Sequence, residues 1–123
     1  MISEVCLCTV ETGEVEVVLV HEGHVEAPNW HPGGWLLVNG MGRLWRLPLD
    51  APGLEPVETG GLLELNNDHG LSPDARLLAI SDKTETGHSC IYLLPSGGGP
   101  EARRVTPKVP SWFHGWTPDG ERL

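Results

Sequence analysis

Basic residues are scarce in this chain of 123 residues. Lys and Arg number 8 against 17 Asp and Glu, which leaves a formal net charge of −9. Nucleic acid binding needs a basic footprint opposite the phosphates, and anionic membrane surfaces attract basic segments in the same way. The composition therefore argues against nucleic acid and membranes as partners, and it is typical of an acidic soluble protein.

Long apolar runs are also missing. No stretch approaches the roughly 20 apolar residues of a membrane span. The first residues, MISEVCLCTVETGE, lack the basic and apolar regions of a secretory signal. We therefore expect a cytoplasmic protein.

Cysteine is rare, with three residues in the chain. Cys6 and Cys8 are two apart in an expected strand, which is a poor geometry for a disulfide, and Cys90 is left over. We expect reduced thiols, as in a cytoplasmic protein. No second cysteine pair completes a metal site with Cys6 and Cys8.

Helix-forming stretches of useful length are absent, whereas glycine and proline are frequent, at 16 and 11 residues. This mixture favours many short strands joined by turns. Two series of segments also recur along the chain. The first contains EAPNWHPGGWLLV, NDHGLSPDARLLA and WFHGWTPDGERL, and the second contains RLWRLPLD and CIYLLPSG.

The prolines of the first series, Pro32, Pro73 and Pro118, recur at intervals of roughly 40 to 45 residues. Each unit reads as four extended pieces: A before the proline turn, B after it, C as in CIYLLP, and D ending in Thr. Four antiparallel strands in a unit of this length are the signature of a β-propeller blade. The sequence therefore predicts an all-β fold.

The single domain 1–123 divides into four parts on this pattern. Residues 1–22 supply pieces C and D of a shared blade, 23–61 and 62–107 form two whole blades, and 108–123 supply piece A and the start of B. The total is about three blades. Because propellers typically have 4 to 8 blades, three cannot close a ring.

Several of these segments resemble the TolB-like β-propellers with WSPDG-type repeats, and the resemblance runs along essentially the whole chain. It is carried by EAPNWHPGG, NNDHGLSPDARLLAISDK, IYLLPSGGGP and PSWFHGWTPDG. The chain is similar in particular to the N-terminal half of uncharacterised six-bladed bacterial members of this family, which are about twice as long as this chain. The repeat also occurs in WD-like and prolyl-oligopeptidase-type propellers. The resemblance implies a six-bladed ring whose last blade is closed by strands from both ends.

This chain departs from the family pattern in two turns: HPGG replaces Ser-Pro-Asp-Gly in the first, and Ala75 stands where Gly is expected in the second. Strand counting suggests that two copies could supply six blades, with the A–B piece of each meeting the C–D piece of the other. We therefore expect a homodimer, which would also cover exposed sheet edges.

Candidate functional residues cluster on piece A. His69 and His114 each stand four residues before the turn proline, next to the central channel of a propeller. With Asn66, Asn67, Asp68 and Trp112 they would form a ligand site at one mouth of the channel. The competing interpretation is that the repeated histidines hold neighbouring strands together. Two histidines without a fixed carboxylate are an incomplete zinc set, so a divalent metal is only a weak possibility and no cofactor is expected.

Other aromatic residues have structural interpretations. Trp30 and Trp116 share a register near the turn proline and are expected in the core between blades. Trp112 and Phe113 are expected nearer the channel mouth. His31 takes the place of a turn serine.

No nucleophile motif is evident, so we favour a non-catalytic binding or scaffold protein with a protein or small-molecule ligand. Two alternatives stay open. One is a metal-dependent propeller lyase or hydrolase that acts on a sugar or lactone with channel histidines. The other is a truncated propeller fragment without a function of its own.

Overall fold

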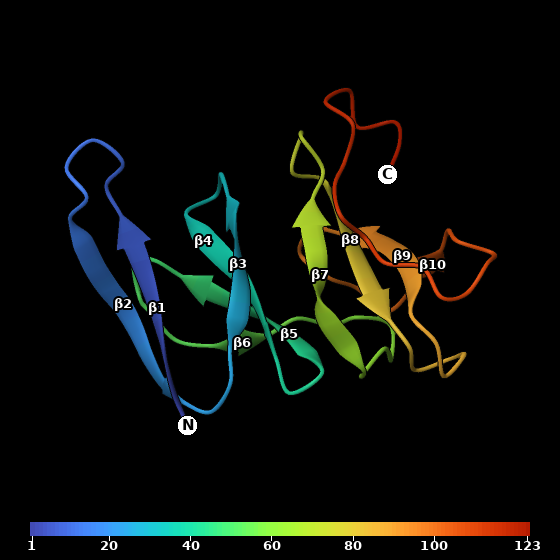
Figure 1. Ribbon diagram of the computed structural model, residues 1–123, viewed down its shortest axis with the longest axis horizontal. Helices are drawn as coiled ribbons and strands as arrows, with labels where there is room; N and C mark the ends of the chain where they lie inside the picture. The colour runs from blue at the N-terminus through green and yellow to red at the C-terminus, as the bar shows by residue number, and fades with distance from the viewer.

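Three antiparallel sheets stand in a row in the computed structural model, which describes residues 1–123 (Figure 1). The first sheet is a hairpin, and the other two have four strands each. The hairpin consists of β1 (Ile2–Cys8) and β2 (Val15–Glu22). No helix is present, so no helix could cross a membrane.

The two four-stranded sheets follow the chain order expected of blades. The second sheet is ordered β3 (Glu26–His31), β4 (Trp35–Gly40), β5 (Arg43–Pro48), β6 (Glu55–Pro56). The third contains β7 (Leu65–Leu71), β8 (Leu77–Asp82), β9 (Cys90–Pro95) and β10 (Arg103–Arg104). All neighbouring strands are antiparallel, which confirms the prediction of all-β, four-stranded propeller blades.

The outermost strands are shorter than the sequence pattern suggests. The D pieces of the two whole blades, LEPVET (54–59) and EARRVT (101–106), retain only the two-residue strands β6 and β10. In β6 the second residue is Pro56, which has no N–H group to donate to a ladder and is therefore tolerated only at a sheet edge.

The core lies between the sheets. Val5 of the hairpin packs with Leu36 and Val38 of β4. On the opposite face of β4, Leu37 belongs to a larger cluster with residues of the third sheet, such as Ile80. Every residue of β4 is buried, because both of its faces are covered. This explains why WLLV is continuously apolar rather than alternating.

Residues 105–123 contain no strand, although piece A of a further blade was expected there. The segment nevertheless packs on the third sheet, where Phe113 is buried against Ala79 and Ile91. It docks through the Phe113 side chain and through hydrogen bonds such as that of the Ser111 N–H with the Ser89 carbonyl, and its path beside β8 is visible in Figure 1.

The proline turns share one mechanism. Ser72 Oγ donates to Asp74 Oδ1 at 2.6 Å and accepts from the backbone N–H of Leu77 at 2.9 Å. Thr117 and Asp119 repeat these contacts in the last turn. Such local side-chain bonds explain why Ser, Thr and Asp flank the turn prolines.

The first turn lacks the Asp and works differently. The Nδ1 of His31 accepts from the Gly33 N–H at 2.9 Å, and the imidazole stacks on Trp35 with ring centroids 4.0 Å apart. His31 thus replaces the turn serine as a local acceptor.

Candidate ligand site at the inner strands

The inner strands β3 and β7 are both irregular near their starts. The register with the next strand shifts between Glu26 and Asn29 in β3, and between Leu65 and His69 in β7. A bulge bends its strand and re-aims the side chains it carries. Asn66, Asn67 and Asp68, all predicted site residues, make up the bulge of β7.

The β7 bulge holds itself together with polar bonds. The Asn66 side-chain amide donates to Asp68 Oδ2 at 3.0 Å, and the Asp68 backbone N–H donates to Asn66 Oδ1 at 3.0 Å. Asn67 is exposed, whereas Asn66 and Asp68 are half-buried. The bulge is therefore a preformed polar corner of the inner strand.

His69 follows the bulge and is buried, with 6% of its surface exposed. Its Nε2 lies 3.3 Å from Oδ1 of Asn39 on β4, so Nε2 carries the hydrogen when Asn39 accepts. The Asn39 amide donates to Glu26 Oε1 at 3.3 Å, and Glu26 lies 3.1 Å from Nε2 of His24. A polar chain thus runs from the surface to His69 and joins the second sheet to the third.

Burial lowers the pKa of His69 to about 4, and the nearby carboxylate of Glu26 opposes this shift. The pKa of Glu26 is lowered chiefly by its bond to His24. His69 is consequently neutral at physiological pH. Its Nδ1 is buried and has no hydrogen-bond partner.

The expected convergence of His69 and His114 is not seen. The imidazole of His69 contacts Asn39 of the preceding sheet, whereas His114 is exposed and makes no hydrogen bond. The reason lies in packing: β7 is sandwiched between two layers, and the segment that carries His114 is covered on one side only. No group of three side chains suited to hold a metal ion is present.

A polar pocket of about 470 Å³ lies at the start of β7. Two predicted residues, Asn66 and Trp112, line it from different segments of the chain. The sequence pattern did not single out Lys83, Ser89 or His88 as parts of this pocket. Its full lining is Glu64, Leu65, Asn66, Ser81, Lys83, Gly87, His88, Ser89, Pro110 and Trp112.

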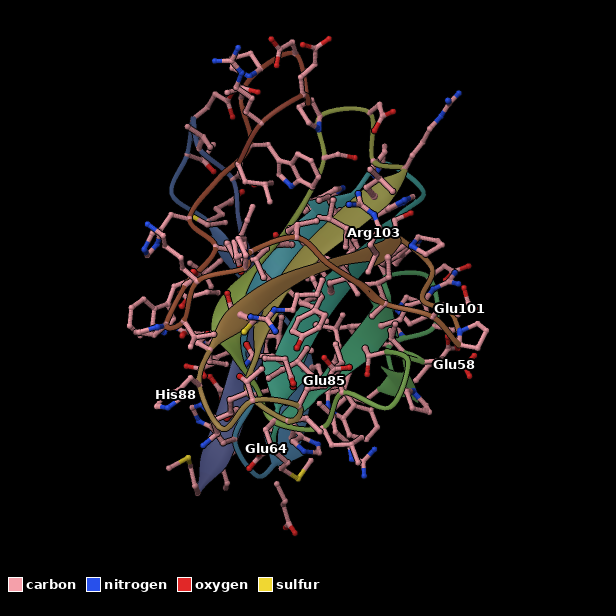
Figure 2. All side chains as sticks on the ribbon, turned by 90° about the vertical axis from the view of Figure 1, so that its right-hand side faces the viewer. Glu58, Glu64, Glu85, His88, Glu101 and Arg103 are labelled. Atoms are coloured by element: carbon pink, nitrogen blue, oxygen red, sulfur yellow. The ribbon has the colours of Figure 1, made fainter.

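The walls of this pocket are held by backbone contacts. The Ser111 N–H donates to the Ser89 carbonyl at 2.8 Å, and the Phe113 N–H donates to Ser81 Oγ at 2.7 Å. Ser89 Oγ is buried without a partner. Figure 2 shows Glu64 and His88 at the same end of the molecule. The sequence could not indicate His88 as a pocket residue, because this requires knowing that its loop lies beside the start of β7.

Phe113 and Trp112 were both expected near the channel mouth, but their side chains have different environments. Phe113 is 5% exposed and Trp112 is 49% exposed. Neighbouring residues of an extended segment point to opposite sides, so one packs on the third sheet and the other faces the pocket.

A second hollow of about 470 Å³ lies at the other end of the row, between β1 and β3. It is lined by Cys6, Leu7, Cys8, Thr9, Glu16, Pro28, Trp30 and Leu36. Trp30 was expected in the core between blades but is 58% exposed. Its register mate Trp116 is partly buried on the cluster of Ala79, Ile91 and Phe113. The difference arises because no inner strand precedes β3 to cover Trp30.

Each four-stranded sheet runs outward from an irregular inner strand, and successive sheets pack face to face. This arrangement defines the class of the chain as a β-propeller built of antiparallel blades.

The particular relatives are TolB-like. The chain is 48% identical to a solved structure described as putative TolB from Agrobacterium tumefaciens. The match covers 96% of this chain and 43% of that one, with a TM-score of 0.92. TolB from Acinetobacter baumannii shares the fold at 20% identity and a TM-score of 0.70, over 94% of this chain and 30% of that one. The resemblance to TolB-like propellers is thereby confirmed.

An uncharacterized protein of Agrobacterium fabrum is 49% identical over 98% of this chain. The chain spans 42% of the length of that relative. No protein-family model matches the chain.

Proposed function

We propose that the chain is a non-catalytic binding or scaffold module that assembles as a homodimeric ring. The observation that carries the assembly is the two-stranded hairpin β1–β2. The other sheets have four strands, whereas β1 pairs with β2 alone and leaves one edge open. An open edge presents unpaired N–H and C=O groups that favour pairing with another strand.

The outer face of the hairpin supports the same proposal. Val15, Val17 and Val20 of β2 are 64%, 47% and 60% exposed. They lie opposite Cys8, Cys6 and Glu4 of β1, and none of them belongs to the cluster that Val5 forms with the second sheet. An exposed apolar patch of this kind marks an interaction surface.

The ligand of the module would bind at the polar pocket near Asn66 and Trp112. An exposed indole beside amide, carboxylate, ammonium and hydroxyl groups suits a protein segment or a small polar molecule.

Sedimentation velocity of the 123-residue chain from nanomolar to high micromolar concentration tests the assembly. We expect a reversible monomer–dimer equilibrium. A stable monomer throughout this range would contradict the ring. A poorly soluble, molten chain would instead favour a propeller fragment without a function of its own.

A metal-dependent enzyme is the second candidate, and one observation favours it. The buried Nδ1 of His69 has no partner and could act as a ligand. The metal content of the purified protein and of the His69→Ala and His114→Ala variants tests this candidate. Stoichiometric metal that both variants lose would support it. No metal, with a lowered melting temperature of His69→Ala, would support the structural role of His69.

The cytoplasmic location stays a prediction. Fractionation of cells that express the intact gene would test it.

A further inference from the structure

The docking of the C-terminal segment on the third sheet provides a template for the contact between inner strands. Trp116 Nε1 donates to the carbonyl of Gly70 on β7 at 3.1 Å. The Trp116 ring packs edge-on against Phe113 at a centroid distance of 6.2 Å. The C-terminal segment is thus attached to the inner strand before it by an indole bonded to a glycine carbonyl.

Trp30 occupies the same place on β3 but lacks this contact. It stands two residues before Pro32, as Trp116 stands two residues before Pro118. It is 58% exposed, and its Nε1 makes no hydrogen bond. The hollow beside it is lined by Cys6 and Cys8 of β1, a strand that pairs with β2 alone. The position that a preceding inner strand would occupy is therefore open.

The space beside Gly115 on the C-terminal segment is also empty. Gly70 and Gly115 each stand three residues before a turn proline. A Cβ atom at Gly70 would lie 2.8 Å from Cε1 of Phe113, so the next inner strand requires glycine there. A Cβ atom at Gly115 would meet nothing within 4 Å.

We propose that the segment Trp112–Thr117 of a second copy docks beside β3, with the Trp30 indole N–H donating to the Gly115 carbonyl of that copy. The contact repeats the one observed between Trp116 and Gly70, and two-fold symmetry makes it twice. The docked segment covers the hollow lined by Cys6, Pro28 and Trp30. This inference rests on the proposed homodimer and specifies its interface.

A second copy fits this surface better than an unrelated strand. Any extended peptide could pair with the edge of β1 through its backbone. The segment Trp112–Thr117 offers, at Gly115, a carbonyl at the same distance from the turn proline as the Gly70 carbonyl that Trp116 binds. This chain contains that segment, and the free side of the segment is uncovered in the same way as β3.

Two variants test the contact by sedimentation equilibrium. Trp30→Phe keeps an aromatic ring but removes the N–H, and Gly115→Ala adds a methyl group where the partner would approach. Each is expected to raise the dimer dissociation constant about ten-fold or more, because each change acts at both copies of the interface. Gly53→Ala is the control, since its Cβ would also meet nothing within 4 Å but it lies in the loop before β6.

The stability of the monomer separates interface effects from folding effects. At high dilution, the melting temperature of Gly115→Ala should not fall below that of wild type, because the added methyl group meets no atom of its own chain and alanine lowers the entropy of the unfolded state. A wild-type dimer whose dissociation constant neither variant changes would overturn the Trp30–Gly115 contact while leaving the ring assembly intact. A wild-type chain that stays monomeric would overturn both.

Discussion

At the scale of single residues, His69 couples stability to pH. Its folded pKa of about 4 lies below the ordinary value of 6.5, so the unfolded state binds a proton first as the pH falls. The stability is therefore fully present above about pH 6.5 and is lost as the pH falls toward 4.

We predict that the free energy of unfolding drops by about 2 to 3 kcal/mol between these pH values because of His69. Urea denaturation at a series of pH values measures the drop. His69→Gln, which can still donate to Asn39, should flatten the curve. His114→Gln is the matched control, because its side chain is exposed. Equal slopes for wild type and His69→Gln would contradict the prediction.

Ala75 carries backbone strain. Its φ of 57° lies in the left-handed region, and the equivalent turn positions are Gly34 and Gly120. A Cβ atom in this region clashes with the backbone, whereas glycine avoids the clash at a cost in unfolded-state entropy.

Ala75→Gly is predicted to stabilise the chain by about 0.5 kcal/mol, and Gly34→Ala to destabilise it by about 1 kcal/mol. A Cβ atom at Gly34 would meet nothing within 4 Å, so the second change tests strain alone. Thermal melting of both variants checks the opposite signs. Two shifts of the same sign would refute the argument.

At the scale of elements, the C-terminal segment is held by few groups. Phe113 supplies the buried side chain, and its N–H donates to Ser81 Oγ at 2.7 Å. No backbone ladder joins the segment to β7 or β8. The docking therefore depends on Phe113 more than on pairing.

Phe113→Ala is predicted to release the segment while the three sheets stay folded, because the loss of a buried Phe costs about 3–5 kcal/mol. Hydrogen exchange should accelerate at the amides of Phe113 and Thr117 and stay unchanged in β4. Trp112→Ala, which truncates an exposed side chain, should leave both rates as in wild type. Global unfolding of Phe113→Ala would show that the segment is integral to the fold.

The sequence predicted most strands because the turn signals and apolar runs repeat. The four-piece unit placed β3 to β5 and β7 to β9 correctly, since each is bounded by Pro, Gly or Asp. It overextended β6 and β10, which lie at sheet edges where burial does not enforce pairing. The bulges in β3 and β7 were invisible, because a bulge depends on register and not on composition.

The candidate site was predictable only in part. Repetition indicated Asn66 and Trp112, which the fold brings to one pocket. Repetition also suggested that His69 and His114 would converge. Residues at the same distance from the turn proline point in the same direction only when their segments have the same neighbours. His69 lies on a strand between two layers, whereas the segment of His114 forms no strand. Lys83 and Ser89 lie in a loop whose path no sequence period specifies.

At the scale of the whole molecule, the cysteines report on assembly. Cys6 and Cys8 are exposed on the hairpin, whereas Cys90 is buried. If another copy covers the hairpin, the reaction of Cys6 and Cys8 with iodoacetamide should slow as protein concentration rises. Mass spectrometry of the labelled peptides measures the rates.

Cys90 serves as the internal control in this experiment, because it should react slowly at every concentration. Labelling of Cys6 and Cys8 at a rate independent of concentration would contradict coverage of the hairpin by a second copy.

The complete burial of β4 has a consequence for how the chain comes apart. Each sheet contacts only its neighbours, so the molecule behaves as a short linear array in which stability is the sum of units and interfaces. The middle unit has two interfaces, whereas the hairpin has one. Opening should therefore begin at the hairpin and reach β4 last, with a gradient of local free energies along the row.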